Sequence, residues 1–250
     1  MNGVNRGQVF VVTTWDDGDK FTWKLTSLLE KYRIKATFFV PIKPTKYGRI
    51  ADEEVRELSK AYDVGGHGIT HSDLTKLPIQ VARKEIKQCK QVLEQLCETT
   101  VQTFSYPGGK LSKELKVAVK DAGFIAARTT KPYNIKETRD PFAIPVSIQA
   151  HRQNISRNLF HLAKIDANLI HHLFKEREKW DKLAEKLFDI CLEKGGVFHC
   201  WGHTWEIEKE DGWKALENIF SHISYRKNVS YLDMRDYAFK VYNDTERVRD

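Results

Sequence analysis

Residues 9–18, close to the N-terminus, read Val9-Phe10-Val11-Val12-Thr13-Thr14-Trp15-Asp16-Asp17-Gly18 and are the most informative part of the sequence. Its first half is apolar and β-branched, which predicts a short buried strand. Two adjacent carboxylates follow where that strand ends. Like charges this close raise each other's pKa, and burial raises both further, so the arrangement is costly. A solvated turn would tolerate it, whereas a metal enzyme would use it, with one carboxylate on the cation and the other free as a base.

Beyond this strand, strand-like and helix-like segments alternate. The expected strands are residues 9–14, 36–40, 64–66, 101–106, 124–128, 144–148, 197–201 and 229–232, and the expected helices are residues 20–32, 52–61, 78–97, 112–122, 158–175, 179–193 and 212–225. Repeated β–α units imply parallel strands with helices packed outside. A barrel and an open doubly wound sheet both fit this pattern. In either, the active site lies at the carboxyl ends of the strands.

Length and composition favour one globular α/β domain over residues 1–250, since no repeat, low-complexity tract or linker divides the chain. The net charge of +7 favours anionic partners such as a phosphate-bearing substrate. The Lys and Arg residues alternate with Glu along helices, however, which is typical of a solvated surface. No compact run of basic and aromatic residues indicates nucleic-acid binding.

Neither a secretion signal nor a transmembrane stretch is present in the sequence, so we expect a cytoplasmic protein. The four cysteines, Cys89, Cys97, Cys191 and Cys200, show no Cys-x-x-Cys spacing. Reduced thiols are the expectation for such a chain.

Three more polar clusters follow predicted strands. His67 and His71 are four residues apart and would share one face if the segment turns helically, although a pair of turn histidines is the alternative. The glycines of Tyr106-Pro107-Gly108-Gly109 expose backbone N–H groups, which suit an oxyanion hole as well as an ordinary strand-to-helix turn. In the last cluster, His199 and His203 lie on the same side of an extended strand, beside tryptophans suited to stacking on a sugar.

Two histidines and one aspartate make a three-ligand catalytic metal site that leaves positions open for water and substrate. The fold would bring these groups to one rim, because each follows a strand.

The four clusters occur in the order and rough spacing of the polysaccharide deacetylase family, which the chain resembles from about Val9 to Tyr231. That family is marked by a Thr-Phe-Asp-Asp-Gly segment, a His-x-x-x-His segment, a Tyr-Pro-Gly-like segment and a late strand with Leu-x-His. The matching segments are Thr14 to Gly18, His67 to His71, Phe104 to Gly108, and the strand with His199 and His203.

The resemblance implies a distorted (β/α)7 barrel with outer helices, and a metal-dependent hydrolase that removes N-acetyl groups from an amino sugar or glycan. By resemblance, the metal, zinc or another divalent cation, is held by Asp17, His67 and His71. Asp16 is then the general base, and the Gly108 N–H helps to bind the oxyanion. Without a secretion signal, we expect a nucleotide- or lipid-linked glycan precursor as substrate, and a lipid-linked one would bring peripheral contact with a membrane. The oligomeric state is left open.

The chain departs from the family at three points, one of which is that it lacks the Asp-Trp pair that some members carry. The other two concern Ser105 and the late histidine. Ser105 stands where many members have an arginine that braces the base, and we expect Arg128, on the neighbouring strand, to supply that guanidinium. The acid that protonates the leaving amine is His203, at the strand end, or alternatively His199, deeper in the strand. Two alternative functions are compatible with the same fold. The chain could be a cyclic amide or ureide hydrolase, or a glycan-binding module without catalytic activity. The intact Asp16 beside a metal ligand argues against the binding module, because binding alone needs no base.

Overall fold

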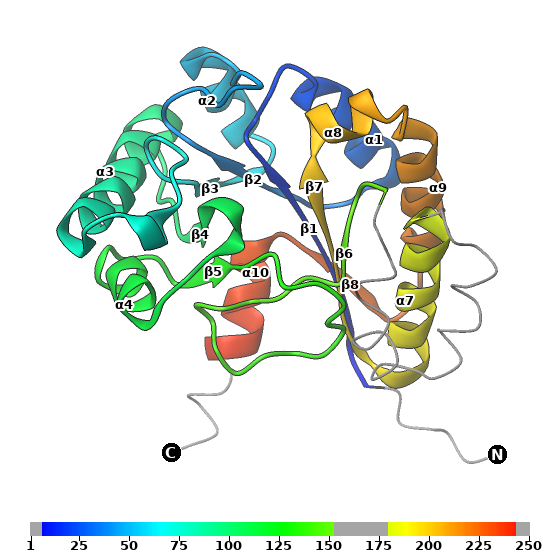
Figure 1. The fold of residues 1–250 in the computed structure, drawn as a ribbon. Coiled ribbons are helices and arrows are strands. Elements are labelled where there is room, and N and C mark those ends of the chain that lie inside the picture. The colour runs from blue at the N-terminus through cyan, green and yellow to red at the C-terminus, as the bar shows by residue number, and fades with distance from the viewer. Residues whose placement is uncertain (1–6, 153–179, 244–250) are drawn as a thin grey trace.

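The computed structural model describes residues 7–152 and 180–243, and Figure 1 shows parallel strands wrapped by helices. The strands are β1 (Val9–Asp16), β2 (Thr37–Val40), β3 (Asp63–Gly66), β4 (Thr103–Ser105), β5 (Ala126–Arg128), β6 (Ile148–Gln149), β7 (Gly196–His203) and β8 (Val229–Leu232). Seven of them pair in the order β5-β4-β3-β2-β1-β7-β6, and β8 pairs with the first half of β1. Every pairing between these strands is parallel.

The helices lie outside the strands, as the alternating sequence pattern predicts (Figure 1). They are α1 (Thr22–Tyr32), α2 (Asp52–Ser59), α3 (Ile79–Cys97), α4 (Lys113–Asp121), α7 (Trp180–Lys194), α8 (Thr204–Lys209), α9 (Trp213–Ile223) and α10 (Met234–Ala238), with the short helical turns η1 (Leu74–Lys76), η2 (Pro107–Gly109) and η4 (Phe239–Asn243). None of the helices within the described ranges is long and apolar enough to cross a membrane.

Residues 144–149 close the row of strands into a distorted barrel. Ile144 forms a parallel bridge with Arg128 at the end of β5, while β6 pairs with β7. Ser147 joins the same closure, since its N–H donates to the carbonyl of His199 over 2.8 Å. The two edges of the sheet therefore meet through an irregular segment. The fold is the distorted (β/α)7 barrel that the family resemblance implies, and not the open doubly wound sheet that the strand and helix pattern also allowed.

Strand β1 is the centre of the structure. All eight of its residues are buried, because β2, β7 and β8 pair with it and helices cover it outside. Trp15 points to the helical layer and packs edge-on against Phe220 of α9, with ring centroids 6.3 Å apart. Side chains alternate along a strand, so its neighbours Thr14 and Asp16 point to the opposite side, into the barrel.

Most predicted elements within the described residues are confirmed, with shifted ends. The strand expected over residues 144–148 is wrong in its bounds, because β6 covers only Ile148–Gln149 and Ile144 forms an isolated bridge. Strand β1 extends to Asp16, so the first carboxylate belongs to the strand itself. Helix α8 and helix α10 were not expected, since both are too short for a clear periodic pattern. The expected helix over residues 158–175 lies outside the described residues.

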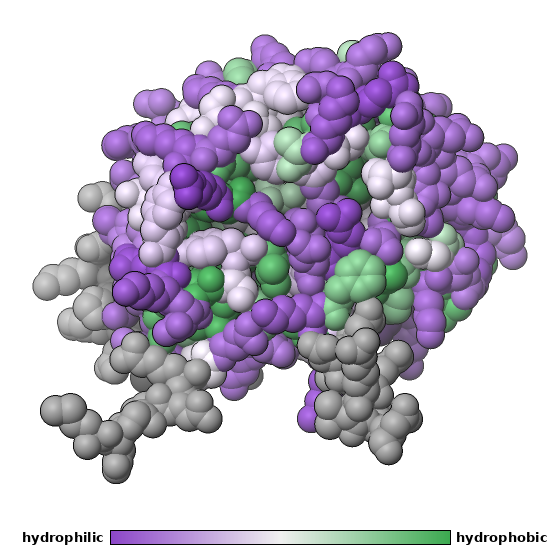
Figure 2. Space-filling model, turned by 180° about the vertical axis from the view of Figure 1, so that it is seen from behind, coloured by the Kyte–Doolittle hydropathy of each residue, from purple (hydrophilic) through white to green (hydrophobic). Residues whose placement is uncertain are grey.

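The surface is that of a solvated globule. Figure 2 shows a face dominated by hydrophilic residues, with the hydrophobic ones in small scattered patches. Among the described residues, the large apolar side chains with the greatest exposure are Trp23, Tyr47, Val81, Val117, Tyr225 and Phe239. Of these, Tyr47 lies beside the cluster described next.

Candidate active site

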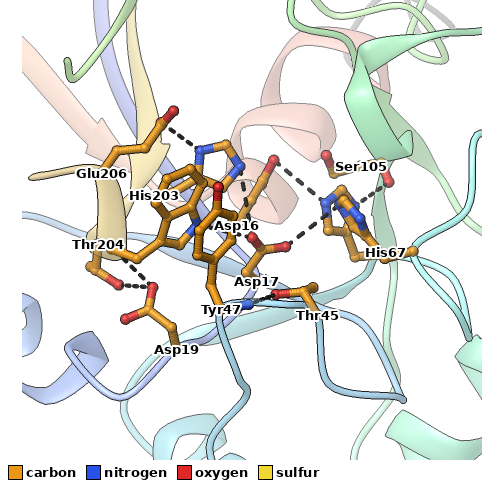
Figure 3. A network of polar contacts seen from close by, with 12 residues as sticks. Asp16, Asp17, Asp19, Thr45, Tyr47, His67, Ser105, His203, Thr204 and Glu206 are labelled. Atoms are coloured by element: carbon orange, nitrogen blue, oxygen red, sulfur yellow. Dashed lines mark hydrogen bonds and ion pairs between the residues drawn. The ribbon is translucent and has the colours of Figure 1, made fainter. Parts of the chain in front are cut away.

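The carboxyl ends of β1, β3, β4 and β7 bring Asp16, His67, Ser105 and His203 together, as Figure 3 shows, and the end of β5 adds Arg128. Asp16 closes β1, and Arg128 closes β5. The Arg128 guanidinium lies 2.5 Å from both carboxylate oxygens of Asp16 and also donates to Ser105 Oγ at 2.6 Å. The small Ser105 side chain leaves room for this reach from the neighbouring strand. The contact expected between Arg128 and Asp16 is therefore present in the structure.

The Arg128 guanidinium is fully buried, and two aromatic rings hold it. Its central carbon lies 5.3 Å from the ring centroid of Phe39 and 4.6 Å from that of Trp201. Burial alone would raise the pKa of Asp16, but the charge of Arg128, with smaller contributions from two nearby histidines, lowers it below its ordinary value. The expectation that the adjacent carboxylates raise each other's pKa is therefore wrong for Asp16. This carboxylate stays ionised.

Asp17, His67 and His71 form a compact cluster beside Asp16. One side-chain donor atom from each lies within 4.8 Å of the others. The rings of His67 and His71 lie 4.7 Å apart at an angle of 66°. The segment that carries them does not turn helically, because Gly68 and His71 both have positive φ angles, of 79° and 55°. A left-handed turn, rather than a shared helix face, therefore brings the two imidazoles together.

The backbone orients His67 for metal binding. Its Nδ1 atom lies 2.7 Å from the carbonyl oxygen of Ser105, which only accepts, so Nδ1 carries the proton. Burial lowers the pKa of His67 well below its ordinary value, which keeps the ring neutral. The Nε2 lone pair then points at the cluster, and a backbone partner on the other ring nitrogen is typical of metal-binding histidines.

Two buried atoms in this cluster are suited to bind a cation. His67 Nε2 and Asp17 Oδ1 are buried and have no hydrogen-bond partner. Such atoms are costly to bury unless something pairs with them. A divalent cation between these two atoms and His71 Nε2 would satisfy both. The donor set of two imidazoles and one carboxylate is one that zinc accepts.

His203 faces the cluster from the end of β7. Its Nε2 lies 4.0 Å from Asp17 Oδ2, and its Nδ1 donates to Glu206 Oε2 over 2.7 Å. Burial alone would lower the pKa of His203, but the hydrogen bond with Glu206 and the nearby carboxylates raise it above its ordinary value. A protonated His203 at neutral pH is the form that can donate a proton.

His199 lies deeper in the barrel and has a different environment. Its Nε2 contacts Thr14 Oγ1 at 3.0 Å, and the side chain is 1% exposed. Burial, with the charge of Arg128, lowers the pKa of His199 to about 3. Its imidazole is therefore neutral near pH 7 and lacks the acidic second proton that an imidazolium would give to an amine.

Gly108 lies in the turn directly after β4, with φ of 65°. The neighbouring Gly109 fixes how closely this turn approaches the end of β5, because a Cβ there would come within 2.1 Å of Thr130 Oγ1. Glycine is thus required for the turn to sit where it does. The turn also borders the histidine segment, since a Cβ at Gly68 would lie 3.7 Å from Pro107 Cγ.

Three residues around the cluster were not predicted from the sequence: Glu206, Asp19 and Tyr47. The contact of Trp205 with Asp17 was not predicted either. The His203-x-x-Glu206 spacing at the start of a helix could have indicated Glu206. The tryptophans also differ from expectation. Trp201 is buried at 5% exposure and offers no open face to a sugar, while Tyr47 covers one face of the partly exposed Trp205 indole.

The fold and the site together define a barrel protein with a two-histidine, one-carboxylate cluster beside a braced carboxylate and a partnered histidine. Comparison with known proteins names the family. The model of the polysaccharide deacetylase family matches residues 3–127, half of the chain. The chain belongs to this family.

Similar proteins agree with this assignment. The chain is 29% identical over 119 residues to the peptidoglycan-N-acetylmuramic acid deacetylase PdaC of Bacillus subtilis, a match that covers 47% of this chain and 25% of the relative. It therefore spans only about a quarter of that protein's length.

Solved structures share the fold. A probable polysaccharide deacetylase from Pseudomonas aeruginosa superposes with a TM-score of 0.69 at 12% identity, over 93% of this chain and 90% of that one. A putative polysaccharide deacetylase from Mycobacterium smegmatis gives 0.65 at 14% identity, over 98% and 94%.

Proposed function

We propose that this chain is a metal-dependent hydrolase that removes N-acetyl groups from an N-acetylated sugar or glycan. The observation that carries the proposal is the Asp17, His67 and His71 cluster, with its buried unpaired atoms, directly beside the ionised Asp16. The family of deacetylases to which the chain belongs supports the reaction class. The name of PdaC, a deacetylase of an N-acetylated amino sugar in peptidoglycan, supports a glycan substrate.

Asp17, His67 and His71 would hold the cation, for which we propose zinc. When bound, it would polarise the amide carbonyl and lower the pKa of a water from 15.7 towards about 7. Asp16 lies beside the cluster as an ionised carboxylate and takes the proton from the attacking water. Arg128 holds that carboxylate in place and ionised.

His203 supplies the proton that the departing amine needs, because an amide nitrogen is a poor leaving group without one. Glu206 orients its ring and stabilises the protonated form. The Gly108 N–H is proposed to receive the developing negative charge on the carbonyl oxygen.

Metal content and acetate release test this function together. Purified protein should contain about one divalent ion per chain, lost in His67→Ala and kept in His222→Ala, whose histidine binds Asp189 outside the site. The loaded protein should release acetate from N-acetylglucosamine oligosaccharides. Asp16→Asn should keep the metal and lose acetate release. Metal-free wild-type protein, even after zinc is supplied, would contradict the mechanism.

A further inference from the structure

We propose that Trp205 is a positioning residue for the metal ligand Asp17, and that Tyr47 clamps Trp205 in that position. The inference rests on the proposed function, because it assigns a role toward the cation held by Asp17. From the sequence, Trp205 is expected only to stack on a sugar. Its contacts point to the metal side of the site instead.

The Trp205 side chain forms a hydrogen bond with one of the two carboxylate oxygens of Asp17. The indole Nε1–H donates to Asp17 Oδ2 over 3.1 Å. The other oxygen, Oδ1, is buried without a hydrogen-bond partner and lies 3.5 Å from His71 Nε2. The indole thus commits one oxygen to a hydrogen bond and leaves only the other for the cation. We infer that Asp17 binds through a single oxygen because of Trp205.

The same loop that carries Asp17 also holds the backbone of Trp205. Asp19, which is fully buried, accepts the Trp205 N–H at 3.0 Å and the Thr204 hydroxyl at 2.5 Å through its Oδ2 atom. Figure 3 shows Asp19 and Thr204 joined in this way below the cluster. Residues 17–19 therefore accept hydrogen bonds from both the backbone and the indole of Trp205, which restricts rotation of the ring.

Tyr47 covers the outer face of the indole. The two rings are stacked with centroids 3.4 Å apart at 13°, while the His203 ring lies 5.3 Å from the same indole. The loop of Tyr47 is tied to both ligand segments. The Ile50 N–H donates to the carbonyl of Gly18 over 2.7 Å, and the Lys43 N–H donates to the carbonyl of Ile69 over 2.8 Å.

These contacts predict a defined energetic role. Partners that hydrogen-bond to a metal ligand fix its orientation, and their loss costs about 10–100-fold in metal affinity. Without the indole N–H, Asp17 Oδ2 is free to rotate or to bind the cation as a second donor. The affinity and the coordination number of the bound ion should both respond.

Trp205→Phe tests the role, because it keeps a ring for Tyr47 to stack on and removes only the donor. Zinc affinity, measured by competition with a chromophoric chelator, should fall about 10-fold or more. In cobalt(II)-loaded protein, the visible absorption should weaken as the coordination number rises. Trp23→Phe is the matched control, since the Trp23 indole donates to Glu54 over 2.8 Å away from the site. It should leave both readouts unchanged.

Tyr47→Ala is a second, independent test at an exposed position, with a thermal melt as the check on folding. It should lower zinc affinity less than Trp205→Phe does, because the indole keeps its hydrogen bond but loses its clamp. Unchanged zinc affinity and cobalt spectrum in folded Trp205→Phe would overturn the inference alone. Wild-type protein that binds no divalent cation would overturn the proposed function as well. Metal binding without acetate release would overturn the proposed reaction and leave the role of Trp205 standing.

Discussion

His199 and His203 lie four residues apart on one strand, yet their surroundings give their imidazoles opposite properties. His203 has Glu206 on Nδ1 and two carboxylates nearby, which favour its protonated form. His199 is buried and has the Arg128 charge nearby, and both lower its pKa and favour its neutral form. Only the first can act as an acid near neutral pH.

His203→Ala should therefore lower kcat for acetate release by about 10²–10⁴-fold, the usual contribution of a general acid. His199→Ala should lose stability through its buried contact with Thr14 and keep most of its kcat. Steady-state kinetics on both variants, with thermal melts as the check on folding, measures the difference. Loss of turnover in His199→Ala alone would assign the acid to the deeper histidine.

At the scale of elements, a buried carboxylate joins three strands at the opposite end of the barrel. Asp63 of β3 accepts hydrogen bonds from Thr37 of β2 at 2.8 Å and from Thr103 of β4 at 3.3 Å. Burial, together with the nearby Asp233, raises the pKa of Asp63 to about 6. The folded state thus binds a proton that the unfolded chain, with an ordinary aspartate pKa of about 3.9, has already released.

This difference predicts a pH-dependent stability. Between about pH 4 and pH 6 the folded state holds more protons at Asp63, so the free energy of unfolding falls as pH rises through that window. Asp63→Asn should be more stable than wild type by about 1–3 kcal/mol at pH 7 and nearly equal to it at pH 4. Urea unfolding across this range measures the difference. Asp121→Asn, an exposed control paired with Arg83, should differ little at any pH.

At the scale of the whole molecule, the Arg128–Asp16 pair ties together strands that are not neighbours. β5 and β1 are separated by β4, β3 and β2 in the sheet, and the two residues are 112 positions apart in the chain. The pair crosses the barrel interior near the segment that closes it. The position of the proposed base, Asp16, therefore depends on the sheet being curved enough to bring β5 opposite β1.

Arg128→Met should fill most of the space between the rings of Phe39 and Trp201 and leave Asp16 as an uncompensated buried charge. We expect a loss of about 3–5 kcal/mol in the free energy of unfolding, with loss of turnover. Adding Asp16→Asn to this variant should recover part of the stability, because the stranded charge is then gone. Equal stability of wild type and Arg128→Met would refute the tie across the barrel.

The alternation of strands and helices and the positions of the polar clusters can be predicted from the amino-acid sequence alone. Both depend on local patterns: apolar runs mark the strands, and polar residues such as Asp17, His67 and Gly108 directly follow them. The carboxyl ends of parallel strands lie at one rim of the barrel, so strand positions alone predict that Asp17 and His67 lie close together. The family resemblance predicts the roles of these residues. The contact of Arg128 with Asp16 is predicted because Arg128 lies on the strand next to that of Ser105.

How these groups change one another's pKa and orientation depends on the tertiary structure. The lowered pKa of Asp16 depends on a guanidinium from a distant strand, and so it ran against the local expectation of two clashing carboxylates. The contacts of Trp205 with Asp17, Asp19 and Tyr47 depend on how α8 packs on two other loops, which no local pattern encodes. Electrostatic and stacking energies depend on distances of a few ångströms between residues far apart in the chain, and folding alone sets those distances.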